Sequence, residues 1–161
     1  MDALDVVVPD EAAIRRLADD LAASLPARAW VALSGDLGAG KTTLVKAVAA
    51  AVGIDPADVV SPTFGLIHEH TGRDRRLIHA DMYRLLDPDE VRETGWEDLA
   101  AGPGWRFVEW PERIADHLPA DRLDITIDIL SPVARGLRLR AGGPDHAAAL
   151  DRLARRRRAE V

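Results

Sequence analysis

Apolar residues along the chain recur with two different spacings, which predict strands and helices in alternation at the N-terminal end. Residues 5–8 form a short apolar run that Pro9 stops, and residues 29–35 form a second run typical of a buried parallel strand. After each run, apolar residues recur every three or four positions, as on one face of a helix. The first helix is predicted to begin after Asp10 and the second to end at Gly53.

The rest of the chain adds strands that long helices do not separate. Residues 64–70 and 76–80 are predicted to be the arms of a hairpin around a polar turn at 71–75. Residues 105–110 are apolar enough for a central strand, and residues 123–130 alternate between apolar and polar side chains. Further predicted elements are a short helix from Asp87 to Gly95, a strand over 136–141 paired with 123–130, and a basic helix at about 144–158. We expect a single three-layer α/β domain over residues 1–161, with a mixed parallel and antiparallel sheet.

Composition narrows the class of protein. The chain has 161 residues, of which 47% are hydrophobic and 30% are charged, as in a globular domain with its own core. It contains no cysteine, which excludes disulfides and thiolate metal sites. A net charge of −6 argues against a broad nucleic-acid-binding face. Since the sequence shows neither a signal peptide nor a membrane span, we expect a cytoplasmic protein without a membrane partner.

The segment SGDLGAGKTTL lies between the second predicted strand and the second predicted helix. Its Gly35, Gly40, Lys41 and Thr42 fit the phosphate-binding pattern G-x-x-x-x-G-K-[ST]. Glycines let backbone N–H groups point at phosphate oxygens, and the start of a helix favours anions. We expect Lys41 to reach the β- and γ-phosphates from a solvent-facing position and the Thr42 hydroxyl to bind Mg²⁺. The alternative, a glycine-rich turn with an incidental lysine, is disfavoured because strand, loop and helix occur in the order that the motif requires.

Two acidic residues follow predicted strands and are candidates for a magnesium site. They are Asp81 and Glu109, and ligand sites of α/β proteins form where strands end. Each has an ordinary structural alternative: Asp81 as a turn residue or helix N-cap, and Glu109 as a surface carboxylate paired with an arginine. Thr63, in the segment SPTF, suits contact with Mg²⁺ or the γ-phosphate, but also an ordinary beginning of a strand. Trp110 could stack on a nucleotide base or pack in an interface.

Other side chains refine the choice of ligand. His68, His70 and His79 lack the spacing of a convincing metal site, and we expect them to be solvated. The run Arg155–Arg158 is expected to be a solvated helix end that the helix dipole stabilises. The sequence has no Asn and no Gln, so it lacks the guanine-reading motif of GTPases and a glutamine to orient the attacking water. ATP is therefore the expected nucleotide.

Four segments together resemble the TsaE family, small bacterial P-loop ATPases required for threonylcarbamoyladenosine formation on tRNA. The segments are GDLGAGKTT at 35–43, SPTF at 61–64, HADMYR at 79–84 and VEWPE at 108–112. The resemblance implies a P-loop NTPase-like fold that uses ATP and Mg²⁺, with Thr42 and Glu109 at the metal. It implies catalytic roles for Lys41, Asp81, Glu109 and Thr63, the last in a switch-like segment. The residues implied to contact the nucleotide are Asp36, Gly38, Ala39, Gly40, Lys41, Thr42, Thr43 and Trp110.

The resemblance also implies two partner proteins, TsaD, which carries the threonylcarbamoyl transfer, and its structural paralogue TsaB. ATP hydrolysis would reset their assembly between turnovers, with tRNA contacted only through the complex. Gly65 and His70 depart from the family pattern, which usually has a hydroxyl residue and a tyrosine there. Two other classes stay open: a P-loop kinase for a small metabolite, and a nucleotide-dependent scaffold with negligible turnover. A kinase would need a second substrate pocket and usually has an arginine-bearing lid over the phosphates, whereas the Arg73–Arg76 cluster lies in the predicted hairpin turn.

Overall fold

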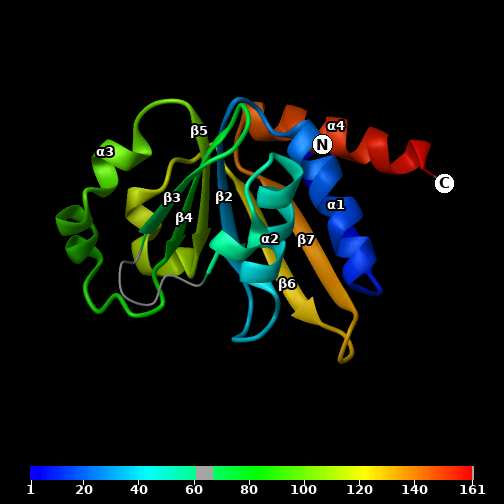
Figure 1. The fold of residues 1–161 in the computed structure, drawn as a ribbon, viewed down its shortest axis with the longest axis horizontal. Coiled ribbons are helices and arrows are strands. Elements are labelled where there is room, and N and C mark those ends of the chain that lie inside the picture. Colours follow the sequence, from blue (N-terminus) through cyan, green and yellow to red (C-terminus); the bar gives the residue numbers. More distant parts are fainter. Residues whose placement is uncertain (61–66, 161) are drawn as a thin grey trace.

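The computed structural model describes residues 1–60 and 67–160 (Figure 1). Its strands are β1 (Ala3–Val8), β2 (Arg28–Ser34), β3 (Ile67–Thr71), β4 (Arg76–Asp81), β5 (Gly104–Glu109), β6 (Leu123–Ile129) and β7 (Arg135–Ala141). Its α-helices are α1 (Glu11–Ser24), α2 (Lys41–Ala51), α3 (Trp96–Ala100) and α4 (Pro144–Ala159), and its 3-10 helices are η1 (Pro56–Asp58), η2 (Pro88–Thr94) and η3 (Pro111–His117). None of the helices in this part of the chain is long and apolar enough to cross a membrane.

All seven strands belong to one sheet, in the order β1-β7-β6-β2-β5-β4-β3. The four inner strands β6, β2, β5 and β4 are parallel, whereas β7, β1 and β3 run antiparallel to their neighbours. The predicted mixed sheet is therefore confirmed. Because the inner strands are parallel, the ends of β2, β4 and β5 meet at one edge of the sheet, at the bottom of Figure 1.

Two apolar clusters cover the two faces of the sheet and confirm the predicted three layers. The larger cluster joins α1, α2 and α4 to alternate residues of the strands, and Figure 1 shows α1 and α2 in front of the sheet. The smaller cluster joins η2, α3 and η3 to the other face. There the rings of Trp30 and Trp96 meet edge to face, with their centroids 5.6 Å apart.

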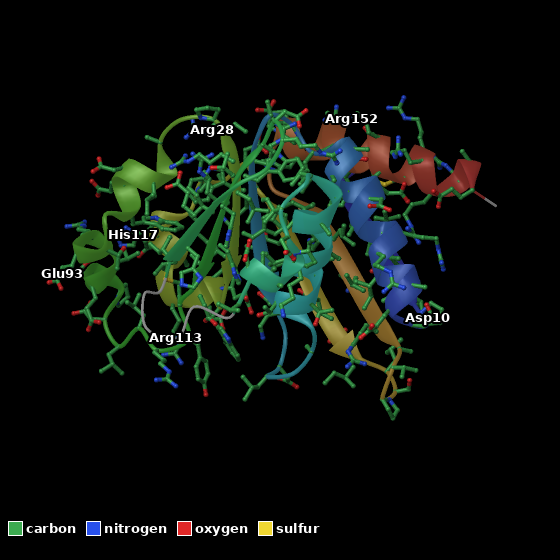
Figure 2. The ribbon with its side chains drawn as sticks, in the orientation of Figure 1. Asp10, Arg28, Glu93, Arg113, His117 and Arg152 are labelled. Atoms are coloured by element: carbon green, nitrogen blue, oxygen red, sulfur yellow. The ribbon has the colours of Figure 1, made fainter. Side chains whose placement is uncertain are left out.

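Most predicted elements are found close to their expected bounds, with a few differences. Asp10 caps α1 as expected, because its carboxylate accepts a hydrogen bond of 2.8 Å from the Ala13 N–H, and Figure 2 shows it at the start of that helix. The predicted short helix is the 3-10 helix η2, which ends at Gly95 with a left-handed φ of 78°. Helix α3 follows directly and was not predicted, and Trp110 lies outside β5.

Helix α4 is anchored more firmly than its basic sequence suggested. Arg156 and Arg157 lie 3.2 and 3.5 Å from carboxylate oxygens of Asp20, whose side chain is buried in α1. Arg155, Arg156 and Arg158 are exposed, as the predicted solvated helix end requires, whereas Arg157 is half-buried. The ion pairs with Asp20 were not predicted, and they arise because a buried carboxylate needs a cationic partner. At the other end of α4, His146 Nε2 accepts a hydrogen bond of 3.1 Å from the backbone N–H of Trp30 in β2.

A buried arginine holds the connection between α3 and β5. Arg106 is fully buried, and its guanidinium donates to the carbonyl oxygens of Gly104, Ala101 and Gly102, each at 2.8 Å. Burial lowers the pKa of Arg106 to about 10, with repulsion from Arg28 and Arg76 adding to the shift, so the side chain stays charged at neutral pH.

Replacing this guanidinium tests its contribution to stability. Arg106→Met should lower the free energy of unfolding by about 2–4 kcal/mol, because three carbonyl groups, including that of the buried Gly104, lose a charged donor. Urea denaturation measures the change. Arg28 is the matched control, since it lies at the surface (Figure 2) and donates to the Ala100 carbonyl at 3.3 Å. Arg28→Met should cost less than about 1 kcal/mol, and equal effects of the two substitutions would contradict this account.

Candidate nucleotide-binding site

The segment between β2 and α2 forms a loop that requires glycine at two points. Gly40 is the N-cap of α2 and has a left-handed φ of 106°, which side chains rarely tolerate. A Cβ on Gly35 would lie 2.7 Å from the carbonyl oxygen of Ile127 in β6, too close for any other residue. No side chain caps α2, so its first N–H groups face the loop. The loop therefore has the shape and the polarity of a phosphate cradle.

Lys41 begins α2 and folds back over this loop. Its ammonium donates to the carbonyl oxygens of Gly35 and Asp36, the latter at 3.2 Å, and lies 4.1 Å from the centre of the Trp110 ring. Only 5% of the residue is exposed, so the prediction of a solvent-facing side chain is wrong. The reason is that the ring of Trp110 covers the lysine. Burial lowers the pKa of Lys41 from its ordinary value, and the carboxylates of Glu109 and Asp81 oppose this shift.

Glu109, at the end of β5, joins three elements of the fold. Its carboxylate accepts hydrogen bonds from the Thr42 hydroxyl, at 2.9 and 3.1 Å to the two oxygens, and from His79 Nε2 at 2.5 Å. Thr42 belongs to the first turn of α2 and His79 to β4. Glu109 is itself buried, with 3% of its surface exposed. The alternative of a surface carboxylate paired with an arginine is therefore wrong.

Asp81 lies beside Glu109 at the end of the neighbouring strand. The two residues are partners in the parallel register of β4 and β5, as the sequence predicted from their places at strand ends. One oxygen of Asp81 also accepts a hydrogen bond of 2.9 Å from the backbone N–H of Tyr83. Asp81 therefore fits both interpretations of the sequence. It is a turn residue, and it lies beside Glu109 at the candidate magnesium site.

Trp110 follows β5 in a left-handed conformation with a φ of 57°, the sole such non-glycine residue in the described part of the chain. Such a conformation costs about 1 kcal/mol or more, and it directs the chain from β5 into η3. The half-buried ring packs against Tyr83, with centroids 4.9 Å apart, and covers Lys41. The side chain predicted to lie near the nucleotide is therefore in contact with the phosphate-loop lysine.

The remaining predicted residues are placed as follows. Asp36 and Gly38 are exposed in the loop, whereas Ala39 is buried. Thr43 is exposed on the first turn of α2. Thr63, with the rest of SPTF and with Gly65, lies outside the described residues, so its role remains a prediction.

Sequence reasoning missed two residues that contact the site. His79 was expected to be solvated, but it is fully buried against Glu109. Its position two residues before Asp81 in a strand could have indicated this, since both then lie on one face. Arg135 donates from β7 to the carbonyl oxygen of Ala39 at 2.9 Å and so fixes the loop from the far side. Nothing in the local sequence marks Arg135 for that contact.

The donor set fits the cofactors expected from the sequence. The Thr42 hydroxyl and the Glu109 carboxylate supply the hard oxygen ligands that Mg²⁺ prefers, 2.9 Å from each other. The loop supplies backbone N–H groups and one ammonium, as triphosphate binding requires. The residues present therefore fit Mg²⁺ with a nucleoside triphosphate.

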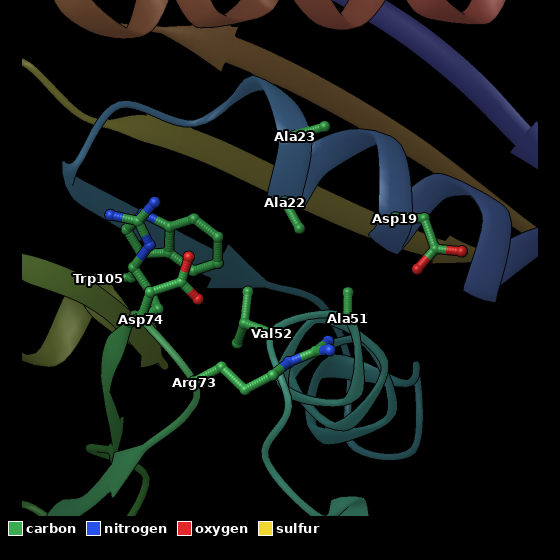
Figure 3. A pocket seen from close by; sticks show the side chains of 9 residues that line it. Asp19, Ala22, Ala23, Ala51, Val52, Arg73, Asp74 and Trp105 are labelled. Atoms are coloured by element: carbon green, nitrogen blue, oxygen red, sulfur yellow. The ribbon is translucent and has the colours of Figure 1, made fainter.

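A groove lies at the edge of the sheet opposite to the loop between β2 and α2 (Figure 3). This groove of about 720 Å³ is lined by the ends of α1 and α2 and by the β3–β4 turn, including Arg73, Asp74 and Trp105. None of the residues predicted to bind ATP lines it. This groove therefore does not coincide with the nucleotide site predicted from the sequence.

Comparison with known proteins decides the family. A protein-family model described as "Threonylcarbamoyl adenosine biosynthesis protein TsaE" matches residues 8–135. The chain belongs to the TsaE family. It is 38% identical over 136 residues to a tRNA threonylcarbamoyladenosine biosynthesis protein TsaE of Aquifex aeolicus, covering 84% of this chain and 94% of the relative. The TsaE protein of Haemophilus influenzae is 33% identical over 133 residues, covering 80% of this chain and 84% of the relative.

A solved structure supports the same assignment. The crystal structure of Bacillus subtilis YdiB superposes with a TM-score of 0.76 at 30% identity, covering 96% of this chain and 95% of YdiB. The resemblance on four short segments is thus confirmed as TsaE membership, and the similarity of fold extends beyond those segments. Helix α4 lies outside the region that the family description matches.

The contact between Lys41 and Trp110 predicts an optical signal for nucleotide binding. Phosphate groups that draw the ammonium away from the ring should change the fluorescence of Trp110, because the ring loses a cation 4.1 Å from its centre. Trp110→Phe should remove most of the ATP-induced change. Trp96→Phe is the control, since Trp96 is buried on the other face of the sheet. A response that persists in Trp110→Phe would contradict the placement of the nucleotide.

Proposed function

We propose that this TsaE-family chain is a Mg²⁺-dependent ATP-binding and ATP-hydrolysing subunit that serves threonylcarbamoyladenosine modification of tRNA. The proposal rests on the hydrogen bonds that Thr42, directly after the Gly35–Lys41 loop, donates to the Glu109 carboxylate. In a phosphate-loop protein, this pairing of a helix-start hydroxyl with a strand-end carboxylate is the ligand set for Mg²⁺.

Each side chain of the site has a defined role in this proposal. The N–H groups of Gly38–Thr43 bind the phosphates, and Lys41 exchanges its contacts with loop carbonyls for contacts with phosphate oxygens. Thr42 and Glu109 hold Mg²⁺, which when bound neutralises charge on the phosphate oxygens. Asp81, beside Glu109, orients the attacking water or the switch-like segment that contains Thr63. Trp110 covers the lysine until the nucleotide arrives.

Partner proteins complete the site in this proposal. Leu37 in the loop is 74% exposed, and Leu86, which follows β4, is 89% exposed. Tyr83, against Trp110, is 44% exposed. Exposed apolar or aromatic side chains in the loop and beside Trp110, such as Leu37 and Tyr83, suit a protein surface that covers ATP. The partners are TsaD-like and TsaB-like proteins, and hydrolysis resets their assembly between turnovers; tRNA is contacted through that complex.

The arginine cluster considered for a kinase lid lies far from the phosphate loop within the described part of the chain. Arg73–Arg75 lie in the turn between β3 and β4, and β4 begins at the edge opposite to the phosphate loop. Figure 1 shows this turn at the top and the loop at the bottom. These arginines are therefore placed away from the phosphates that a lid would cover.

Single-turnover ATP hydrolysis tests the proposal. The chain alone should bind ATP but hydrolyse it slowly, because it has no glutamine to order the water. Addition of TsaD-like and TsaB-like proteins should accelerate hydrolysis on the order of 10³-fold. Fast hydrolysis by the chain alone, unaffected by the partners, would overturn partner gating, and transfer of phosphate to a small metabolite would favour the kinase.

A further inference from the structure

A buried histidine contacts the carboxylate that the proposed function places at Mg²⁺. His79 lies in the middle of β4, with 0% of its side chain exposed, and its Nε2 is 2.5 Å from Glu109 Oε2. The contact follows from the register, because His79 and Asp81 lie on the same face of β4 as Glu109 does on β5. Glu109 thus has a hydrogen-bond partner on the side away from the phosphate loop.

The hydrogen bonds decide which nitrogen carries the proton. A carboxylate only accepts, so Nε2 of His79 donates to Glu109. Its Nδ1 is buried and has no hydrogen-bond partner among residues 1–60 and 67–160. Within the described residues, the contact with Glu109 is the one hydrogen bond that offsets the cost of burying this imidazole, a cost that an apolar side chain would avoid.

The other carboxylate oxygen has a different environment. Among the described residues, Glu109 Oε2 accepts from both His79 and the Thr42 hydroxyl, whereas Oε1 accepts only the longer Thr42 contact, at 3.1 Å. Fixing Oε2 therefore fixes the plane of the carboxylate and leaves Oε1 the freer oxygen beside Thr42. Histidine–carboxylate contacts of this kind orient metal ligands in other proteins, and their loss typically weakens metal affinity about 10- to 100-fold.

We propose that His79 is a positioning residue, which holds the Glu109 carboxylate in the orientation that binds Mg²⁺ together with Thr42. The inference rests on the proposed Mg²⁺–ATP site and adds to it a residue that does not itself touch metal or nucleotide. The buried Nε2–H of His79 restricts rotation of the Glu109 carboxylate. Loss of that donor should impair Mg²⁺ binding while leaving the metal-free affinity for ATP unchanged.

Two substitutions separate this role from ordinary packing. The amide nitrogen of glutamine is three bonds from Cβ, as Nε2 of histidine is, whereas that of asparagine is only two bonds away. His79→Gln therefore retains a donor within reach of Glu109, and His79→Asn places a similar amide too far back. Both variants bury a neutral polar group, so they are a matched pair for stability. His68→Asn, directly opposite on β3, controls for the same change on the neighbouring strand.

The readout is binding of a fluorescent ATP analogue, titrated with Mg²⁺ and measured separately in EDTA, with folding checked by urea denaturation. His79→Asn should raise the Mg²⁺ concentration at half-maximal binding about tenfold or more, as Glu109→Gln should. His79→Gln and His68→Asn should stay within about threefold of wild type. In EDTA the affinities of His79→Asn, His79→Gln and His68→Asn should agree with that of wild type. His79→Asn added to Glu109→Gln should shift the midpoint little further, because both act through one carboxylate.

Several outcomes would overturn the inference. If His79→Asn is less stable but keeps the wild-type Mg²⁺ midpoint while Glu109→Gln shifts it, His79 is structural and only the inference fails. The same conclusion follows if His79→Gln is as impaired as His79→Asn. If wild-type binding does not respond to Mg²⁺ at all, the proposed function fails and the inference fails with it.

Discussion

The carboxylate of Glu109 is the point on which the arrangement of the site depends. It binds the first turn of α2 through Thr42 and the middle of β4 through His79, while its own strand lies between β2 and β4. These contacts require the parallel register that brings the ends of β2, β4 and β5 to one edge. A buried carboxylate without such donors would be costly, so the hydrogen bonds also explain how an acidic residue lies at the end of a core strand.

Contacts from β6, from β7 and from Trp110 fix the conformation of the phosphate loop. The carbonyl oxygen of Ile127 in β6 leaves room only for glycine at position 35, and Arg135 in β7 binds the carbonyl oxygen of Ala39. Trp110, in its left-handed conformation, covers Lys41. The loop is therefore preorganised by strands distant in sequence, and preorganised donors bind charge without further rearrangement. In the proposed function, the Lys41 ammonium must leave both the loop carbonyls and the ring of Trp110 when the nucleotide binds.

Local features of the chain were predictable from the sequence because nearby residues determine them. The cap at Asp10, the glycine loop and the sequence of strands follow from spacing and from residue types within a few positions. Long-range features were not. The burial of His79 depends on pairing with β3 and β5, and the burial of Lys41 on a tryptophan 69 positions later in the chain. Helix α3 was not predicted because its five residues, which follow a left-handed glycine, are too few to show the periodic spacing of apolar side chains that marks a helix. The role of Thr63 stays a prediction.

The central claim is that the edge formed by the 35–43 loop, Glu109 and Trp110 binds Mg²⁺–ATP. Calorimetric titration of ATP in the presence of Mg²⁺, into the wild type and Lys41→Ala, tests it most directly. Because a charge-assisted hydrogen bond to phosphate is worth about 1.5–3 kcal/mol, the variant should bind ATP at least about tenfold more weakly. Its urea denaturation curve should show that it remains folded. A folded Lys41→Ala protein with wild-type affinity for ATP would contradict the account.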